Sequence, residues 1–321
     1  MLKNLDCRVV ALEEHYWDHE LSSLYSGGDT IGSSHMRALL LDHEHDRLAA
    51  MDAAGIDTQV LSHAPPSTQK LPHDIAVPLT RRVNDRLAQI VARHPQRFAG
   101  FAALPTAQPA AAADELERCV REHGFKGAMI HGLVEGAFVD HRRFWPIFAR
   151  AEAMDVPIYL HPAVPQDVVV NAYYKDYEKE FPMFPRAAWG YTVQSATQAI
   201  RMVLSGVFEE HPRLKIILGH LGEGVPFLLW RIDEALARPG HKPLNFAEVF
   251  RRNFWITTSG FFSDNALVCS IKELGSDRVL FSVDYPFVLN ETGTSWLAKV
   301  PLTDAEKTML AGGNARRLLR L

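Results

Sequence analysis

Four short apolar runs in the sequence each end in a residue type that can bind a divalent metal ion. They occupy residues 9–15, 156–161, 215–220 and 279–284, and their last residues are His15, His161, His220 and Asp284. Runs of this length and composition are typical of parallel strands buried between helices on both faces. In a β/α barrel the C-terminal ends of the strands converge on one face, where the active site lies. The sequence therefore predicts that these strand ends meet around one ion.

The side chains of Glu13 and His15 are expected to share a face of the first strand, because side chains alternate along a strand. Glu14 then points the other way. His161 and His220 each follow an apolar run and are expected to be buried. For one buried histidine a hydrogen bond is the more common partner. Agreement among four strand ends favours a metal ion instead.

Glu13, His15, His161 and Asp284 form a mixed set of nitrogen and oxygen donors. Such a set suits Mn²⁺, Fe²⁺ or Zn²⁺ and lacks the thiolates of a structural zinc site. Carboxylates favour harder ions, so the sequence predicts one divalent metal per chain, with Mn²⁺ preferred and Zn²⁺ possible. Most of the other histidines lie in predicted loops or helices and are interpreted as surface residues.

The strand pattern repeats along the whole chain, and helical patterns separate the strands. Counting the first strand, about eight strand–helix units are present, which predicts an α/β fold of the (β/α)8 TIM barrel type. We expect one domain over residues 1–321. The further strands are expected at 58–62, 98–104, 126–130, 156–161, 214–219, 254–258 and 279–283. Helices are expected near 42–54, 74–93, 110–123, 144–154, 188–210, 225–236, 265–274 and 304–318.

Two segments are predicted to be loops at the mouth of the barrel. Residues 22–34 are polar and rich in glycine, and residues 162–187, inserted after the fifth strand, are rich in aromatic side chains between prolines. A loop as long as the second is usually functional. Its aromatic residues fit a lid or subunit contact and, equally well, a plug packed against the top of the barrel.

Composition excludes several classes of protein. The 47% of hydrophobic and 22% of charged residues are those of an ordinary globular protein, and the net charge of −4 gives no case for nucleic acid or an anionic membrane. No apolar stretch approaches the ~20 residues of a membrane span. The first strand follows the N-terminus directly, and the three cysteines are far apart, so we expect a cytoplasmic protein without disulfides.

Together the motifs resemble the amidohydrolase-related decarboxylases, most closely the γ-resorcylate (2,6-dihydroxybenzoate) decarboxylases. The matching segments are ALEEH at 11–15, YLHP at 159–162, ILGHLGEGVP at 217–226 and FSVDYPF at 281–287. The resemblance implies an α/β barrel, a divalent metal and nonoxidative decarboxylation of an ortho-hydroxylated aromatic acid. It also implies a homodimer or homotetramer that takes a small aromatic acid as its substrate.

The resemblance assigns roles to individual residues. Glu13, His15, His161 and Asp284 match the metal ligands of the family. Asp284 is also the candidate proton donor. His220 matches the active-site histidine, with Glu223 as its carboxylate neighbour. Arg231 and Phe287 match an arginine near the substrate and an aromatic residue lining the ring pocket.

Some assignments stay open. Arg231 could pair with a substrate anion or hold Glu223, and a structural role is about as well supported. His63 and His131 stand where the γ-resorcylate enzymes tend to carry Asn, so His131 is a candidate substrate contact or a partner of a backbone carbonyl. A metal-dependent hydrolase of an amide, lactone or C–C bond is the alternative activity. A non-catalytic binding protein is a third interpretation, which the complete ligand set does not support.

Overall fold

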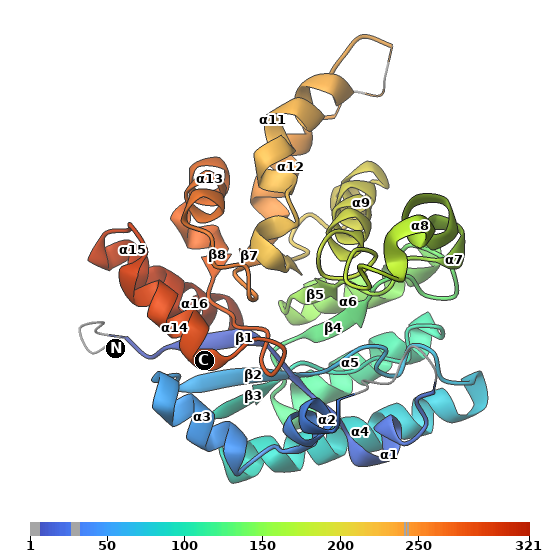
Figure 1. Ribbon diagram of the computed structural model, residues 1–321. Helices are drawn as coiled ribbons and strands as arrows, with labels where there is room; N and C mark the ends of the chain where they lie inside the picture. Colours follow the sequence, from blue (N-terminus) through green and yellow to red (C-terminus); the bar gives the residue numbers. More distant parts are fainter. Residues whose placement is uncertain (1–6, 27–32, 241, 243) are drawn as a thin grey trace.

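The computed structural model describes residues 7–26, 33–240, 242 and 244–321. In this part of the chain, eight parallel strands follow one another in sequence order, and helices surround them (Figure 1). The strands are β1 (Val10–Tyr16), β2 (Thr58–His63), β3 (Phe98–Gly100), β4 (Ala128–His131), β5 (Ile158–His161), β6 (Ile216–Leu218), β7 (Phe254–Thr257) and β8 (Val279–Leu280). The predicted strands are all present, although several are shorter at their ends.

Hydrogen bonds join the strands into two sheets, β1-β2-β3 and β4-β5-β6-β7-β8. Backbone bonds from Ala102 N to Gly127 O (2.9 Å) and from Met129 N to Ala102 O (3.2 Å) connect the β3 and β4 segments. At the other edge, His15 N donates to Tyr285 O over 2.7 Å. The arrangement confirms the predicted α/β barrel fold, with strands that run parallel and converge at their C-terminal ends.

Sixteen α-helical segments, several only one turn long, accompany the strands among the described residues. They are α1 (His19–Ser22), α2 (Ser34–Leu41), α3 (Asp46–Ala54), α4 (His73–Arg93), α5 (Pro109–His123), α6 (Trp145–Met154), α7 (Asp167–Val169), α8 (Lys175–Glu178), α9 (Gly190–Leu204), α10 (Val207–Glu210), α11 (Val225–Leu236), α12 (Phe246–Asn253), α13 (Asp264–Leu274), α14 (Asn290–Lys299), α15 (Asp304–Thr308) and α16 (Asn314–Leu319). Shorter turns of 3-10 or π type are η2 (Arg142–Phe144), η3 (Val170–Tyr174), η4 (His220–Gly222), η5 (Ser276–Arg278) and η6 (Met309–Gly313). None of these helices is both long and apolar enough to cross a membrane.

Alternation along the strands separates two apolar cores. The inner core fills the barrel below the strand ends and includes Val10, Leu12, Val60, Phe101, Met129, Tyr159, Ile217 and Leu280. The larger core lies between the strands and the helices and includes residues from the same strands at alternate positions, such as Ile130, Leu160 and Leu218. This packing supports the barrel mouth from below, as expected for strands buried on both faces.

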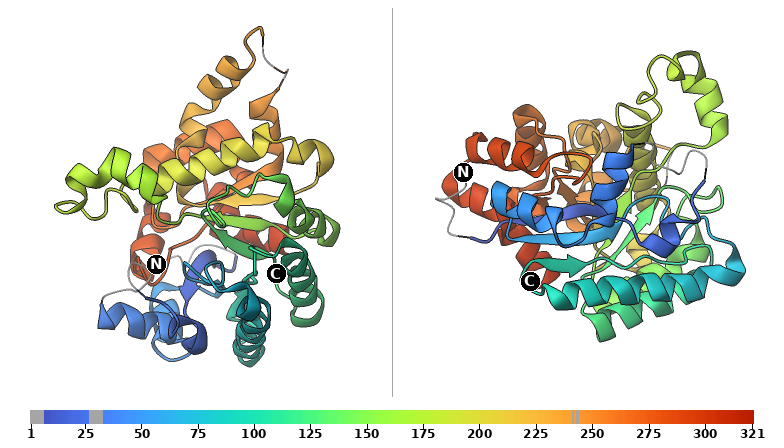
Figure 2. Two further views of the ribbon diagram at one scale, coloured as in Figure 1. Left: turned by 90° about the vertical axis from the view of Figure 1, so that its right-hand side faces the viewer. Right: turned by 60° about the horizontal axis from the view of Figure 1, so that its bottom comes forward.

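The aromatic insertion differs from its prediction as a loop. Residues 162–187 contain α7, η3 and α8, and this segment projects from the barrel in both views of Figure 2. Tyr174 is buried and contacts Phe184, whereas Tyr173, Tyr177 and Phe181 are mostly exposed. A plug into the barrel would bury all of these rings, so the plug interpretation is wrong for the exposed three.

Other local predictions also change. The glycine-rich segment 22–34 lies partly outside the described residues, and its described ends belong to or adjoin α1 and α2. The predicted helix 42–54 begins only at Asp46, because the side chain of Asp42 accepts hydrogen bonds from the backbone N–H groups of His45 and Arg47 and forms a turn. It ends as predicted at Gly55, which has a φ of 75°.

Candidate metal centre and active site

A bulge in β1 directs both of its predicted ligands into the barrel. Pairing with β2 shifts by one residue between Ala11 and Glu14, so an extra residue is accommodated in β1. Leu12 belongs to the inner core, and after the shift Glu13 and His15 face the same centre. Glu14 contacts a different set of residues on the other side of the strand. The expected separation of Glu13 and His15 from Glu14 is therefore observed.

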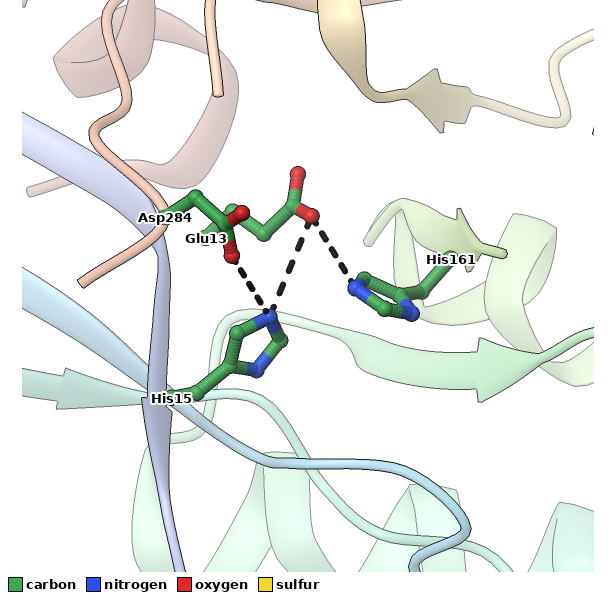
Figure 3. Close-up of side chains that lie close together, drawn as sticks. All are labelled: Glu13, His15, His161 and Asp284. Carbon is green, nitrogen blue, oxygen red and sulfur yellow. Dashed lines mark ion pairs between the residues drawn. The ribbon is translucent and has the colours of Figure 1, made fainter. Parts of the chain in front are cut away.

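The four predicted metal ligands lie together at the mouth of the barrel (Figure 3). Their ligand atoms are all within 4.8 Å of one another. Nε2 of His15 is 3.3 Å from Oδ1 of Asp284, and Nε2 of His161 is 3.1 Å from Oε1 of Glu13. Donor atoms that share one ion at about 2.1 Å are roughly 3–4 Å apart. The spacing thus fits a single divalent ion.

The unused atoms of these side chains support the same interpretation. Oε1 of Glu13 and Nε2 of His15 are buried and have no hydrogen-bond partner. His161 donates from Nδ1 to the carbonyl of Pro162 over 2.6 Å, which leaves its Nε2 lone pair directed at Glu13. A buried polar atom without a partner is costly, and a metal ion satisfies these acceptors together. The residues present therefore fit the predicted ion.

Hydroxyl groups from β5 and from the segment that follows β7 hold the second oxygen of Glu13. Tyr159 Oη and Ser259 Oγ both donate to Oε2, and Thr257 Oγ1 lies 2.7 Å from Tyr159 Oη. These residues were not among the site residues predicted from the sequence. Because side chains alternate along a strand, Tyr159 shares a face with His161, and this spacing was the signal that could have found it.

Gly219 allows this arrangement by leaving space at the end of β6. A Cβ atom at this position would lie 3.0 Å from Oε2 of Glu13 and 3.3 Å from the hydroxyl of Tyr159. Its φ is −69°, so the backbone does not require glycine. The close approach of the Glu13 carboxylate is the reason that glycine fits here.

Burial and neighbouring charges act in opposite directions on the two carboxylates. Burial alone would raise the pKa of Glu13, yet His220, His15 and His161 hold it well below its usual range. Burial raises the pKa of Asp284, and the charge of Glu13 adds to this, although His15 opposes it. Glu13 is thus the carboxylate that stays ionised, and Asp284 is the one that holds a proton more readily.

A left-handed turn presents His220 and Glu223 beside this centre. The five residues from His220 to Gly224 all have φ between 47° and 77°. Such a conformation is unfavourable for residues other than glycine, and strained backbone of this kind is concentrated at functional sites. Nδ1 of His220 lies 2.8 Å from Oε1 of Glu223, which is buried. Burial lowers the pKa of His220, but the charges of Glu223 and Glu13 outweigh this and raise it to about 10.

Phe287 and His131 also lie next to the predicted metal ligands, whereas no described contact joins Arg231 to them. The ring of Phe287 is 5.7 Å from that of His15, and the ring of His131 is 4.8 Å from that of His161. Arg231 is exposed on α11, and no contact joins it to Glu223. The interpretation of Arg231 as a residue that holds Glu223 is therefore not supported among the described contacts.

The two histidines at the ends of β2 and β4 have defined tautomers. His63 donates from Nδ1 to the carbonyl of Ala64 (2.9 Å) and accepts at Nε2 from the N–H of Asp18 (3.0 Å). His131 donates from Nε2 to the carbonyl of His63 (2.9 Å). Its Nδ1 is therefore an acceptor, and this atom is buried without a partner. Gln69 bonds the backbone of His131 at both its N–H and its carbonyl, which fixes the end of β4.

Comparisons with known proteins agree with this geometry. The family model described as "Amidohydrolase" matches residues 15–321. The γ-resorcylate decarboxylase of Rhizobium sp. (strain MTP-10005) is 39% identical, over 97% of this chain and 98% of the relative. A crystal structure of 2,6-dihydroxybenzoate decarboxylase complexed with 2,6-dihydroxybenzoate has a TM-score of 0.90 at 38% identity and covers 98% of this chain and 100% of that chain.

A second similar structure contains a metal. The dihydroxybenzoic acid decarboxylase of Polaromonas sp. JS666, solved with bound manganese and the inhibitor 2-nitroresorcinol, has a TM-score of 0.89 at 36% identity. It covers 98% of this chain and 97% of that chain. The predicted resemblance is confirmed over the full length of the described barrel. The chain belongs to the amidohydrolase family.

Proposed function

We propose that the protein is a metal-dependent, nonoxidative decarboxylase of an ortho-hydroxylated aromatic carboxylic acid. The observation that carries the proposal is the cluster of Glu13, His15, His161 and Asp284, with His220 and Glu223 beside it. The γ-resorcylate decarboxylases, to which the chain is 39% identical, favour this activity over the hydrolase alternative. The substrate is a small aromatic acid that resembles γ-resorcylate, and the products are a phenol and CO₂.

The cofactor is one divalent ion per chain, with Mn²⁺ preferred and Zn²⁺ possible. Glu13, His15, His161 and Asp284 would hold it, and the manganese in the Polaromonas structure supports the preference. When bound, such an ion would supply positive charge that stabilises the negative charge of the substrate. Glu13 is fixed for this purpose through Oε2 by Tyr159 and Ser259, which leaves Oε1 free.

Asp284 is the proposed proton donor. Its side chain is 18% exposed, more than that of Glu13 or His15, and it lies on the side of the cluster that a substrate can reach. A proton moves from Asp284 to the ring carbon that bears the carboxylate, the bond from this carbon to the carboxylate carbon breaks, and its electron pair returns to the ring as CO₂ leaves. The hydroxyl group ortho to the carboxylate raises the electron density at the carbon that accepts the proton.

His220, held by Glu223, orients the substrate and assists proton movement. The contact with Glu223 fixes Nδ1, so Nε2 is the nitrogen left for the substrate. Phe287 would line the slot for the aromatic ring. Arg231 is exposed on α11, so we propose it as a substrate contact only for an anionic group of the substrate that lies away from the metal centre.

His131 is proposed as the contact for a hydroxyl group of the substrate. Its unpartnered Nδ1 accepts a hydrogen bond and cannot donate one in this tautomer. A second ring hydroxyl would satisfy this atom, whereas a methoxy group would not. We expect hydroxybenzoates with such a hydroxyl to bind about tenfold more tightly than their methoxy analogues, by the ~1.4 kcal/mol that one hydrogen bond provides.

We further propose that the protein forms a homodimer or homotetramer. Phe227 and Trp230 on α11 are 80% and 74% exposed, and the aromatic insertion adds the exposed Tyr173 and Tyr177. Exposed aromatic side chains in this number are typical of protein interfaces. Light scattering on the purified protein, coupled to size-exclusion chromatography, gives the mass of the assembly.

A panel of hydroxybenzoates tests the activity itself. The metal-replete protein should release CO₂ from at least one ortho-hydroxybenzoate, which is monitored as a loss of ultraviolet absorbance. In concentrated bicarbonate it should carboxylate the phenol. Elemental analysis gives the metal content of the same preparation. Cleavage of amides or lactones without release of CO₂ from any hydroxybenzoate would establish the hydrolase instead.

A further inference from the structure

Glu14 lies between two metal ligands in the sequence but faces away from the metal centre. Its side chain is completely buried. Burying a carboxyl group is costly unless it is well hydrogen-bonded, so its partners indicate what this residue does. Three of those partners belong to the segment that carries Asp284. The fourth, on β2, is connected through a buried arginine to the strand that carries Glu13 and His15.

The two oxygens of Glu14 bind the backbone on both sides of Asp284. Oε1 accepts from the N–H of Val283 over 2.9 Å, and Oε2 accepts from the N–H of Tyr285 over 3.2 Å. The hydroxyl of Ser282 donates to Oε1 over 3.3 Å and accepts from the N–H of Glu13 over 2.7 Å. One carboxyl group thus holds the residues before and after the candidate proton donor.

Asp284 has a backbone conformation that needs such support. Its φ is 71°, in the left-handed region that residues other than glycine seldom adopt. This conformation directs Oδ1 towards Nε2 of His15, 3.3 Å away. Strained backbone persists only where the surrounding structure determines it. The bonds to Glu14 hold the N–H groups on either side, while the carbonyls of Asp284 and Tyr285 accept from Val288 and His15.

A buried arginine and a glutamine hold Glu14 from behind. Arg47, also fully buried, donates from Nη1 to Oε1 of Gln59 over 3.1 Å, and Nε2 of Gln59 donates to Oε2 of Glu14 over 3.3 Å. Arg47 also donates to the carbonyl of His15, and its guanidinium lies 4.8 Å from the centre of the Tyr285 ring. The positive charge and the glutamine therefore connect β1, β2 and the segment after β8.

We propose that Glu14 is a positioning residue that determines the orientation of Asp284 at the metal centre, and that Gln59 and Arg47 hold Glu14 in place. The inference rests on the proposed function only in taking Asp284 as a ligand of the ion. Burial raises the pKa of Glu14 to about 8, while the N–H of Val283 and the charge of Arg47 lower it. Oε1 accepts from Ser282 and the N–H of Val283, and Oε2 accepts from Gln59 and the N–H of Tyr285, so all four contacts use the carboxyl oxygens as acceptors.

Glu14→Gln is the direct test. Glutamine has the same shape, but its amide nitrogen donates and cannot accept, so one of the two backbone bonds is lost. With the metal-free protein titrated with Co²⁺, we expect the dissociation constant to rise about 10- to 100-fold and the visible absorption spectrum to change. With Mn²⁺ and substrate, kcat should fall about 10- to 100-fold while KM stays within threefold.

Glu115→Gln provides the matched control. Glu115 is a second buried glutamate, on α5, where it accepts from Asn84 (2.8 Å) and Arg118 (2.7 Å). The same substitution there should lower the melting temperature without changing the Co²⁺ spectrum or affinity. A Glu14→Gln protein that only loses melting temperature, like this control, would show a purely structural role and overturn the inference.

Ser282→Ala is the milder second variant, for use if Glu14→Gln does not fold. It removes one contact to Glu14 and also the acceptor of the Glu13 N–H, and it leaves both backbone bonds to Glu14, so Co²⁺ affinity should fall about threefold to tenfold in the same direction. Wild-type affinity and spectrum in a folded Ser282→Ala protein would then overturn the inference. A shifted Co²⁺ spectrum in a protein that decarboxylates no hydroxybenzoate would uphold the positioning role while the proposed function fails.

Discussion

The two sides of the barrel mouth are built differently. On the β1 and β8 side, donors from the protein hold the carboxyl groups of Glu13 and Glu14: Tyr159 and Ser259 hold Glu13, and backbone N–H groups hold Glu14. On the β2 and β4 side, His63 and His131 bond to backbone carbonyls, and Nδ1 of His131 has no partner. The first side thus fixes two carboxyl groups through donors from the protein, whereas the second leaves an acceptor for a substrate.

This difference suggests a division of labour. Groups that must keep an exact relation to a metal ion are fixed by many bonds, because small displacements are costly to catalysis. Groups that recognise the substrate keep a hydrogen-bonding atom without a protein partner. Substitutions on the β1 and β8 side should therefore act on metal binding and turnover, and substitution of His131 on the β2 and β4 side should act on substrate binding.

Asp284→Asn should have the largest effect. Asparagine can still offer one oxygen to the ion but carries no acidic proton. We expect turnover to fall by more than the ~10²–10⁴ typical of one acid–base group, because the metal site is perturbed too. Steady-state kinetics and metal analysis on the same preparation check this. A variant that holds its metal and turns over within tenfold of wild type cannot use Asp284 as its acid, and His220 would take the role.

His161→Ala and His131→Ala compare a proposed metal ligand with a proposed substrate contact directly. The two residues are register partners at the ends of β5 and β4, and their rings touch. Loss of a ligand should weaken metal binding at least about 100-fold in His161→Ala, while His131→Ala should stay within about threefold of wild type and lose substrate affinity instead. Equal metal content in both variants would remove His161 from the ligand set.

Gly219→Ala should have a moderate effect, and this effect should be on metal affinity. The added methyl group would press on Oε2 of Glu13 at 3.0 Å, so the carboxylate must move by a few tenths of an ångström. We expect metal affinity to fall about tenfold. Gly55→Ala is the control, because it strains the left-handed end of α3 with no atom within 4 Å and should lower stability alone. Wild-type metal affinity in Gly219→Ala would mean that Glu13 has room to adjust.

The sequence predicted the strand ends well because their signal is local. A short apolar run followed by Glu-x-His, His or Asp places a polar side chain at the end of a buried strand, and the barrel brings these ends together. The face that Glu13 and His15 share could also be predicted from alternation. The bulge that places Glu13 on the same inner face as Leu12 could not be predicted. A bulge depends on pairing with β2, which is remote in sequence.

The residues that support the centre were harder to predict. Ser259, Arg47 and Gln59 act through partners more than ten residues away, and nothing in their local pattern distinguishes them from ordinary polar residues. The left-handed turn from His220 to Gly224 could not be predicted either, because glycine is the usual signal of positive φ and only two of the five residues are glycine. The helical turns of the aromatic insertion were missed since prolines and aromatic residues there resemble a loop.

His63 should produce the smallest effect, and it should appear in stability and not in the chemistry. Burial lowers the pKa of His63 to about 4, although its bond to Ala64 and the charge of Asp18 raise it. In the unfolded chain the pKa is about 6.5, so on acidification the unfolded state binds a proton before the folded state does. The contribution of His63 to stability is therefore fully present at about pH 8 and is lost as the pH falls through 6.5 towards 4. Between pH 8 and pH 6 this loss amounts to about 1 kcal/mol.

Denaturant unfolding at pH 8 and pH 6, for wild type and His63→Gln, measures this contribution. Glutamine can accept from Asp18 N–H and donate to the carbonyl of Ala64, as His63 does, but it does not titrate. The variant should lose about 1 kcal/mol less than wild type between the two pH values, while its metal affinity stays unchanged. An identical loss in both proteins would mean that His63 is protonated as easily in the fold as in the unfolded chain. The β2 end would then be open to solvent, and the contrast with the buried β1 and β8 side would be sharper than the structure indicates.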